Sequence, residues 1–301
     1  MEDITDTVFR RIVASCGKPD VFVTEFTNCD GIWSDGREVV AQRLQYCEEE
    51  RPIIAQIWGI HPEAFTKTAE LLVELGFDGI DINFGCPEKS VVKSGACAAM
   101  IEEPEIAIAI IKATKRGADN LPISVKTRLG FRRIQTEEWI PRLLDTGLDA
   151  LTIHGRTARE MSDVSAHWDE IGKAVAIRNK LGVDTVIIGN GDVKMLVEGR
   201  EKANTFCVDG VMIGRGIFDN PWLFNTDREG TVPQKKELLQ LLVTHVRLFE
   251  KTWGKTKNFA IMKKFFKMYV RGFSGASELR EKLMTAQTHQ DVETIILPLL
   301  A

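Results

Sequence analysis

Short apolar runs alternate with longer amphipathic stretches along most of the chain. The runs are rich in β-branched residues and only four to six residues long, as is typical of parallel strands that are buried on both faces. Between most of them, apolar residues recur at helical spacing, for example over 61–75 and 104–115. The expected strands are 21–26, 53–58, 79–84, 123–128, 150–154, 185–189 and 210–213.

Seven strands in this rhythm indicate an α/β protein with the (β/α)₈ TIM-barrel architecture, one strand short of closure. The remaining strand should precede an expected helix over 5–15. The sequence opens directly at Met1, close to that helix. We therefore expect the first barrel strand to be missing or truncated.

The rhythm changes after residue 222. Residues 226–234 are polar and rich in turn formers, which is typical of a linker. Three helical stretches follow, one starting at 235 and the others over 259–270 and 276–286. The sequence thus predicts a barrel domain over 1–230 and a small helical domain over 235–301.

Composition narrows the class of protein. The 301 residues are 44% hydrophobic and 27% charged, as in ordinary globular proteins. No apolar run approaches the ~20 residues that span a bilayer, so we expect no membrane association. The six cysteines are scattered without CxxC pairs, which argues against a structural zinc site and a disulfide scaffold and fits a reducing compartment. We expect a cytoplasmic monomer without metal.

The net charge of −4 hides an asymmetry. Residues 235–301 hold twelve Lys/Arg and six Asp/Glu, so the rest of the chain is acidic. A basic tail on an acidic body fits an anionic partner. A solvated helical face explains the same charges, and charge alone favours that simpler interpretation.

The most informative segment follows the strand over 79–84, where the chain reads Gly-Cys-Pro with the cysteine at position 86. Glycine and proline mark a turn, which places the Cys86 thiol just past the C-terminal end of the strand. Parallel α/β enzymes bind ligands and carry out chemistry at that end. Cys86 is therefore a candidate proton donor or nucleophile.

The other strand ends carry polar residues as well. Each alone is more often structural: Gln56 as a satisfied amide, Lys126 as a loop charge, His154 as a hydrogen-bonded ring, and Asp192 as a helix N-cap after a turn. Polar endings on six successive strands nevertheless predict one shared site. These endings include Gln56, Asn83, Lys126, Arg128, His154, Arg156, Asn190, Gly191, Asp192, Gly214 and Arg215.

Glycine-rich turns follow the last two expected strands. Free backbone N–H groups and a positive helix end make such turns suitable for phosphate. Gly214 and Gly216 let the backbone approach an anion closely, and Arg215 adds charge-assisted bonds. With Lys126 and Gln56 near a heterocyclic ring, the pattern favours a phosphorylated cofactor, of which FMN is the natural candidate.

These motifs together resemble the tRNA-dihydrouridine synthases. The resemblance runs in order over 1–225. It rests on six motifs: MEDITD at 1–6, NFGCP at 83–87, VKTRLG at 125–130, HGRT at 154–157, NGD at 190–192 and IGRG at 213–216. It implies an FMN-bound barrel that reduces the C5–C6 bond of a uridine in the tRNA D-loop, with NADPH reducing the flavin. The tail resembles the family's RNA-binding domain.

The resemblance also implies roles for individual residues. Cys86 corresponds to the proton donor, and Met1 is what remains of an Ala-Pro-Met strand whose backbone contacts the flavin. Asn83, Arg128 and Arg156 would face the uridine or the RNA backbone. The remaining expected FMN contacts are Gln56, Lys126, His154, Asn190, Gly191, Asp192, Gly214 and Arg215. The expected phosphate contacts of the tail are Lys263, Lys264, Lys267 and Arg271.

A proton donor must be protonated when it acts, so Cys86 is expected to be a thiol with an ordinary pKa near ~8.5. Two other functions fit parts of the pattern. A different FMN-dependent pyrimidine oxidoreductase, such as a dihydroorotate or dihydropyrimidine dehydrogenase, would not need the basic tail. A non-catalytic RNA-binding barrel is the alternative from another class.

Overall fold

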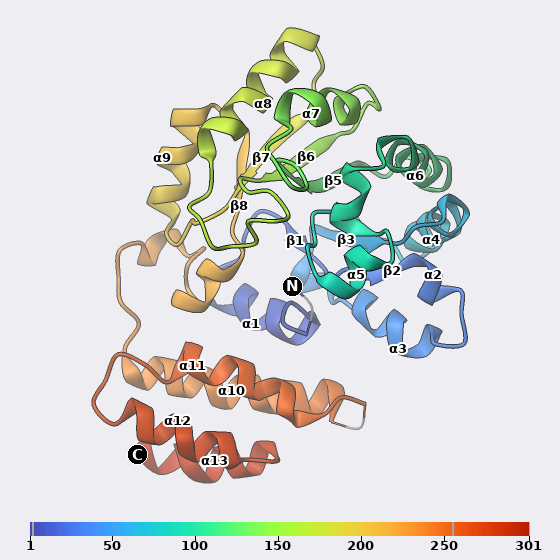
Figure 1. Cartoon of the computed structure of the whole chain (residues 1–301). Helices are drawn as coiled ribbons and strands as arrows, with labels where there is room; N and C mark the ends of the chain where they lie inside the picture. Colours follow the sequence, from blue (N-terminus) through green and yellow to red (C-terminus); the bar gives the residue numbers. More distant parts are fainter. Residues whose placement is uncertain (2, 255, 301) are drawn as a thin grey trace. The chain divides into compact units, whose positions relative to one another are not determined.

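Parallel strands form one sheet whose order follows the chain (Figure 1). The computed structural model describes residues 1, 3–254 and 256–300. Within these residues the ladder runs from β1 to β8, and no pairing joins β8 back to β1. The strands are β1 (Phe22–Val23), β2 (Thr27–Asn28), β3 (Ile53–Trp58), β4 (Gly79–Phe84), β5 (Ile123–Arg128), β6 (Ala150–His154), β7 (Val186–Asn190) and β8 (Gly210–Met212). The α/β TIM-barrel class is confirmed.

The strand expected over 21–26 is interrupted. Two short strands, β1 and β2, pair with the beginning and the end of β3 instead. Between them the backbone N–H of Gln56 donates to the side-chain Oγ1 of Thr24 at 3.0 Å. A hydroxyl thus replaces a backbone carbonyl as the acceptor, and sequence periodicity cannot reveal that exchange.

Helices follow the strands and lie outside the sheet (Figure 1). Their apolar residues face the strands; α4, for example, buries Phe65, Ala69 and Leu72. Neighbouring helices also pack on one another, α4 on α6 and α7 on α8. The helices that accompany the sheet are α2 (Cys29–Ile32), α3 (Arg37–Ala41), α4 (Pro62–Glu74), α5 (Lys89–Lys93), α6 (Pro104–Gly117), α7 (Thr136–Leu144), α8 (Trp168–Leu181) and α9 (Leu196–Phe206).

Three turns that lead into strands β4, β6 and β8 share one pattern. Each has a residue with positive φ, then a buried apolar residue, then an aspartate. The carboxylate of Asp78, Asp149 or Asp209 accepts the backbone N–H of a residue at the beginning of the preceding strand, each at 2.7 Å. These aspartates therefore tie together the N-terminal ends of neighbouring strands.

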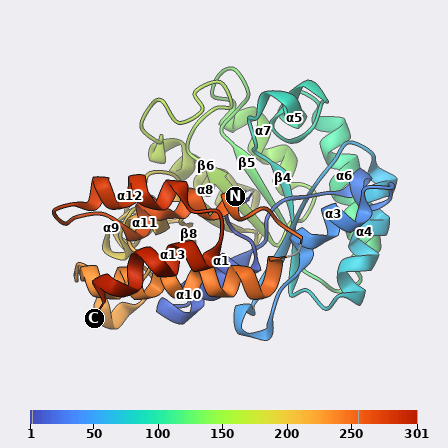
Figure 2. The same cartoon turned by 90° about the horizontal axis from the view of Figure 1, so that it is seen from below.

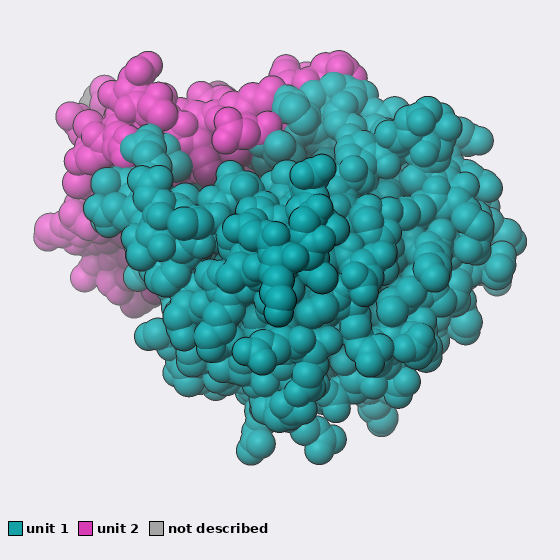
Figure 3. Space-filling model, turned by 90° about the horizontal axis from the view of Figure 1, so that it is seen from above, with its two compact units in different colours: residues 1, 21–46, 51–214 teal, residues 2–20, 47–50, 215–301 magenta. Residues whose placement is uncertain are grey.

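The chain forms two compact units (Figure 3). One comprises residues 1, 21–46 and 51–214, and the other 2–20, 47–50 and 215–301. The second unit therefore includes residues 2–20 and 215–230, which the sequence assigns to the barrel domain. The assignment of functions to 1–230 and 235–301 stays a prediction.

The second unit is helical. The stretch expected to be helical over 259–270 begins as a 3₁₀ helix. A fourth helix, α13, follows the three expected helical stretches. It packs against α10 (Figure 2). The elements of this unit are α1 (Thr7–Cys16), α10 (Lys235–Trp253), the 3₁₀ helix Phe259–Phe265, α11 (Phe266–Tyr269), α12 (Ala276–Thr285) and α13 (His289–Ile296). None of the helices in the described part of the chain is long and apolar enough to cross a membrane.

The N-terminal helix α1 belongs to the core of this unit. Asp6 caps α1 by accepting the backbone N–H of Phe9 at 2.9 Å, and it also accepts the indole N–H of Trp253 at 2.7 Å. The rings of Phe9 and Phe265 stack with centroids 5.2 Å apart. The C-terminal helices are therefore built around a segment from the beginning of the chain.

Candidate functional site

Two side chains fix the backbone around Cys86. Asn83, in the fully buried strand β4, accepts the N–H of Gly85 at 3.0 Å and of Cys86 at 2.9 Å through its Oδ1. Arg128, at the end of β5, donates from Nε to the carbonyl oxygen of Gly85 at 2.7 Å. The Cys86 side chain is partly exposed. The loop is thus ordered, while its thiol remains accessible.

The environment of Cys86 changes its acidity. A hydrogen bond from Cys97 is the largest influence and, with smaller contributions, lowers the Cys86 pKa to about 7 against the opposing effect of burial. Cys97 has a φ of 52°, and the next residue, Ala98, donates its N–H to the carbonyl of Cys86 at 3.2 Å. The expected pKa near ~8.5 is therefore too high, because a sequence does not reveal a second thiol beside the first.

A buried hydrogen-bonded chain lies behind Asn83. Asn83 donates from Nδ2 to Oε1 of Gln56 at 3.0 Å, and Gln56 donates from Nε2 to Asp81 at 2.7 Å. Ser124 donates its hydroxyl to the other oxygen of Asp81 at 2.6 Å. Sequence reasoning missed Asp81, although a charged residue inside the apolar run 79–84 was a visible signal.

Lys126 supplies a cation at the end of β5. Its ammonium group donates to Oδ1 of Asn190 at 3.1 Å, and Asn190 donates to the carbonyl of Met212 at 2.8 Å. Burial, with the charge of Arg128, lowers the Lys126 pKa to about 8, while Asp81 acts in the opposite direction. Lys126 is therefore still mainly protonated at neutral pH.

Arg156 and Asp192 form an ion pair. Both terminal oxygens of Asp192 accept from Nη2 of Arg156, at 2.7 and 2.6 Å. The other terminal nitrogen of Arg156 lies 3.1 Å from Nε2 of His154. Since a guanidinium can only donate, the His154 ring proton belongs on Nδ1. The flavin contact expected of Asp192 and the RNA contact expected of Arg156 stay predictions.

The two glycine turns differ in their surroundings. Gly191 has a φ of 133°, and a Cβ there would lie 2.7 Å from the Cβ of Ala166, so the position requires glycine. A Cβ on Gly214 would meet no atom within 4 Å. Arg215 begins the 3₁₀ helix Arg215–Asp219 and belongs to the second unit, whereas Met1 belongs to the first.

The residues at the ends of β3, β5, β6 and β7 are suited to a flavin. An amide at Gln56, an ammonium at Lys126, an imidazole at His154 and an amide at Asn190 provide donors and acceptors for the edge of a heterocyclic ring. The partly buried cation matches a ring that gains electrons. Among the described residues, no group of three His, Cys, Asp or Glu side chains could hold a metal ion.

Basic residues of the second unit lie on and around α11. Lys264 pairs with Asp3 at 3.1 Å, and Arg271 with Asp219 at 3.3 Å; both pairs are partly exposed. Lys267 is exposed, and Lys263 partly so. Lys263 and Lys267 are accessible to a polyanion, whereas Lys264 and Arg271 are paired with aspartates; the expected phosphate contacts stay predictions.

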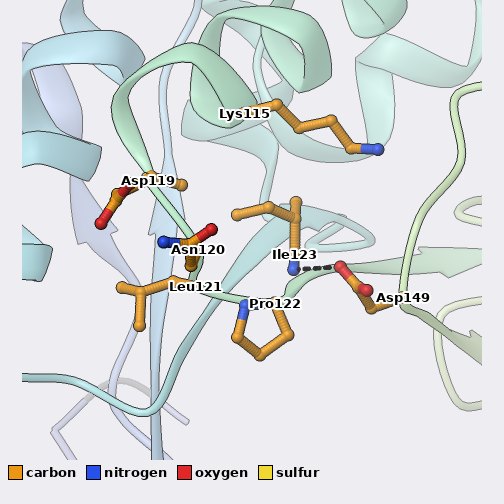
Figure 4. Close-up of a pocket in the computed structure, with 8 residues that line it drawn as sticks. Lys115, Asp119, Asn120, Leu121, Pro122, Ile123 and Asp149 are labelled. Atoms are coloured by element: carbon orange, nitrogen blue, oxygen red, sulfur yellow. Dashed lines mark hydrogen bonds between the residues drawn. The ribbon is translucent and has the colours of Figure 1, made fainter.

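A separate cavity lies at the other end of β5. Its lining includes Lys115, Asp119, Pro122 and Asp149, and the Asp149 carboxylate there points to the backbone nitrogen of Ile123 (Figure 4). Ile123 begins β5, whereas Lys126 and Arg128 lie further along it. The cavity is therefore distinct from the surroundings of Cys86.

The sequence model of the family described as "Dihydrouridine synthase (Dus)" matches residues 1–299. The chain belongs to the dihydrouridine synthase family. It is 43% identical to a probable tRNA-dihydrouridine synthase of Staphylococcus aureus (strain COL), over 98% of this chain and 90% of that protein. It is 42% identical to probable tRNA-dihydrouridine synthase 2 of Bacillus subtilis (strain 168), over 98% and 91%.

Solved structures share the fold at low sequence identity. A complex of 2-naphthoyl-CoA reductase superposes with a TM-score of 0.56 at 11% identity, over 76% of this chain and 48% of that one. Histamine dehydrogenase from Rhizobium sp. 4-9 gives a TM-score of 0.53 at 12% identity, over 80% and 46%. The chain thus spans about half the length of these two structures, and the likeness concerns the fold alone.

Proposed function

We propose that this dihydrouridine synthase reduces the C5–C6 double bond of a uridine in the D-loop of tRNA. FMN is the proposed cofactor, NADPH the reductant of the flavin, and Cys86 the proton donor. The observation that carries the proposal is a partly exposed thiol with a pKa of about 7 at the end of a barrel strand. The family match and the names of the curated relatives support the substrate class.

The residues for FMN follow from the donor set. Gln56, Lys126, His154 and Asn190 would hold its ring system, with Gly191, Asp192, Gly214, Arg215 and the backbone of Met1 as the further proposed contacts. Bound FMN would supply the hydride that saturates the pyrimidine ring. Lys126 would stabilise negative charge nearby, since a partly buried ammonium acts more strongly than a solvated one.

Cys86 would give the proton that completes the reduction. A general acid works best when its pKa lies near the operating pH, because it is then protonated yet gives up its proton readily. The Cys97 hydrogen bond brings the Cys86 pKa to about 7. Asn83 and Arg128 hold the loop that carries the thiol, and we propose that both lie beside the target base.

The tail would bind the tRNA backbone. A base must leave the RNA stack to reach an enclosed site, which costs a few kcal/mol. Contacts of Lys263, Lys264, Lys267 and Arg271 with phosphates would offset that cost without reading sequence. We propose that the protein acts in the cytoplasm as a monomer.

The proposed reaction can be tested with purified protein, FMN, NADPH and a tRNA transcript without modifications. We expect dihydrouridine at a D-loop position, detected by nucleoside mass spectrometry and mapping. A transcript in which cytidines replace the D-loop uridines is the matched control and should give no product. Flavin-loaded protein that leaves the first transcript unchanged would contradict the proposal, and reduction of orotate or free uracil instead would favour the alternative pyrimidine oxidoreductase.

The proposed tRNA contacts can be tested at Lys263 and Lys264. Replacing both by glutamate should weaken tRNA binding and flatten its dependence on salt, because fewer counterions are released on binding. The measurement is the dissociation constant over a series of salt concentrations. Reversing two other basic residues, Arg116 and Lys112 of α6, is the matched control. An unchanged dependence of the dissociation constant on salt in the tail variant would contradict the proposed contacts of the tail with tRNA.

A further inference from the structure

Four side chains connect the interior of the sheet to the Cys86 loop. Ser124 donates to Asp81, Gln56 donates to Asp81, Asn83 donates to Gln56, and the N–H groups of Gly85 and Cys86 donate to Asn83. Asp81, Gln56 and Asn83 are all nearly fully buried, at 2%, 6% and 6% exposed. The bonds therefore run without interruption from β5 through β4 and β3 to the loop.

Both ends of this chain of bonds determine its direction. The loop N–H groups can only donate, so the oxygen of Asn83 must face them and its NH₂ must face Gln56. At the other end, Ser124 donates to one oxygen of Asp81 and the NH₂ of Gln56 donates to the other, so the oxygen of Gln56 faces Asn83. The two requirements agree, and neither amide can turn over without leaving buried groups unpaired.

Asp81 lies where it can impose this direction. In the sheet register it is beside Gln56 on β3 and Ser124 on β5, and Asn83 is beside Lys126. Burial raises the Asp81 pKa, while the two donors and the charge of Lys126 favour its ionised form. Each of its carboxylate oxygens has a donor, so the surrounding groups match an acceptor on both sides.

We propose that Asp81 is a positioning residue for the proton donor: its carboxylate sets the direction of the Gln56 and Asn83 amides and thereby holds the Cys86 loop. The inference deepens the proposed function, since it rests on Cys86 as the acid. Asp81 itself does not touch the thiol. It acts through Gln56 and Asn83, and a misplacement of about 1 Å at a reacting group can cost about 10²-fold in rate.

The decisive test exchanges the carboxylate of residue 81 with the amide of residue 83. In Asn83→Asp alone, an ionised carboxylate at 83 cannot donate to Gln56, and a turned Gln56 would direct its oxygen at the Asp81 carboxylate. Adding Asp81→Asn removes that conflict. The new amide donates to the Gln56 oxygen, Gln56 donates to the carboxylate at 83, and that carboxylate still accepts the two loop N–H groups. All bonds are restored with the direction reversed.

The readout is the pH dependence of Cys86 alkylation, followed by mass spectrometry of the peptide that contains it. Asn83→Asp should move the midpoint of alkylation to higher pH, since a loosened loop loses the Cys97 hydrogen bond, and a rise of one pKa unit slows alkylation at pH 7 about fivefold because only the thiolate reacts. The double variant D81N/N83D should regain the wild-type midpoint. Asp81→Asn alone should have a small effect, because its amide can still offer an oxygen to Gln56.

Asp81→Val separates hydrogen bonding from charge. It removes the same charge as Asp81→Asn but offers Gln56 no polar group, so D81V/N83D should remain impaired and D81V alone should raise the midpoint. A folded D81V with the wild-type midpoint, or a double variant D81N/N83D no better than N83D, would overturn the proposal. If D81V fails to fold, the comparison of N83D with D81N/N83D still decides.

Asp149→Asn is the matched control, since Asp149 also accepts a donor from a neighbouring strand, the backbone N–H of Ile123, but lies at the N-terminal end of its strand. Its Cys86 alkylation should be unchanged, and a shift equal to that of D81V would overturn the proposal by showing a general effect of losing a sheet carboxylate. Alkylation needs neither tRNA nor flavin turnover. A wild-type protein that makes no dihydrouridine would therefore refute the proposed function while leaving the test of Asp81 intact.

Discussion

Aspartates at the N-terminal ends of the strands and an aspartate inside β4 form similar bonds for different purposes. At the N-terminal ends of the strands, Asp78, Asp149 and Asp209 each accept a backbone N–H of a neighbouring strand at 2.7 Å. Inside β4, Asp81 accepts two side chains, Ser124 and Gln56. The first three tie strands together, whereas Asp81 orders side chains that lead to Cys86.

The partner of each carboxylate explains the difference. A backbone N–H has its direction fixed by the strand, and a guanidinium, such as Arg51 on Asp78 or Arg178 on Asp209, can only donate, so these acceptors contribute stability without choosing an orientation. A side-chain amide can turn over, so its acceptor also determines which group the amide presents on its far side. In barrels the N-terminal face generally serves stability and the C-terminal face chemistry. Here the same residue type follows that division.

The largest expected effect is at Cys86. Cys86→Ala should lower dihydrouridine formation about 10²–10⁴-fold, the usual contribution of a general acid, while leaving flavin absorbance and the midpoint of urea unfolding close to wild type. Cys207→Ala, which removes an exposed thiol, is the matched control. Full turnover in the Cys86 variant would rule out Cys86 as the acid. The contrast between Asp81 and the strand-tying aspartates would then have no functional meaning.

The opposite pattern is expected at Asp149. Asp149→Ala leaves the buried N–H of Ile123 without its acceptor, which should lower the free energy of unfolding by about 1–3 kcal/mol. Its kcat for dihydrouridine formation should stay near wild type. Urea unfolding and turnover measured on the same preparation check both expectations, with the exposed carboxylate variant Asp145→Ala as the control. A loss of kcat without a loss of stability would contradict the proposal that the N-terminal ends of the strands serve stability and the C-terminal ends serve chemistry.

The smallest expected effect concerns the position of a pH limb. Cys97→Gly removes the hydrogen bond that lowers the Cys86 pKa, and glycine suits the φ of 52° at this position. A proton donor is active below its pKa and loses activity as the pH rises through it. The descending limb of kcat/KM should therefore lie near pH 7 in the wild type and at higher pH in the variant. A limb that stays in place would mean that Cys86 does not control it.

Sequence periodicity located most of the barrel. Four strands, 53–58, 79–84, 123–128 and 150–154, have the expected bounds, because each is a short buried run bordered by turn residues. The interruption between β1 and β2 depends on one side-chain acceptor, Thr24, which leaves no mark on hydrophobic pattern. The inclusion of α1 in the second unit depends on contacts more than two hundred residues apart along the chain.

The candidate site was located but not explained by the sequence. Cys86, Lys126 and Asn190 stand out because they lie within two residues of the C-terminal end of a strand, and that end of a parallel strand has a known place in a barrel. Cys97 and Asp81 do not end strands, and their importance comes from what lies beside them. The pairing of Arg156 with Asp192 likewise joins two residues that the sequence assigned to different partners.

The sequence by itself determined the order of strands and helices, the end of the barrel at which the polar candidate residues gather, and the position of the thiol. These follow from patterns that repeat along the chain and from turn residues next to them. The tertiary structure alone decided the acidity of that thiol and the direction of the bonds that hold it. Both depend on neighbours from other strands and loops, because proton affinity and hydrogen-bond direction are set by distances in space rather than by spacing along the chain.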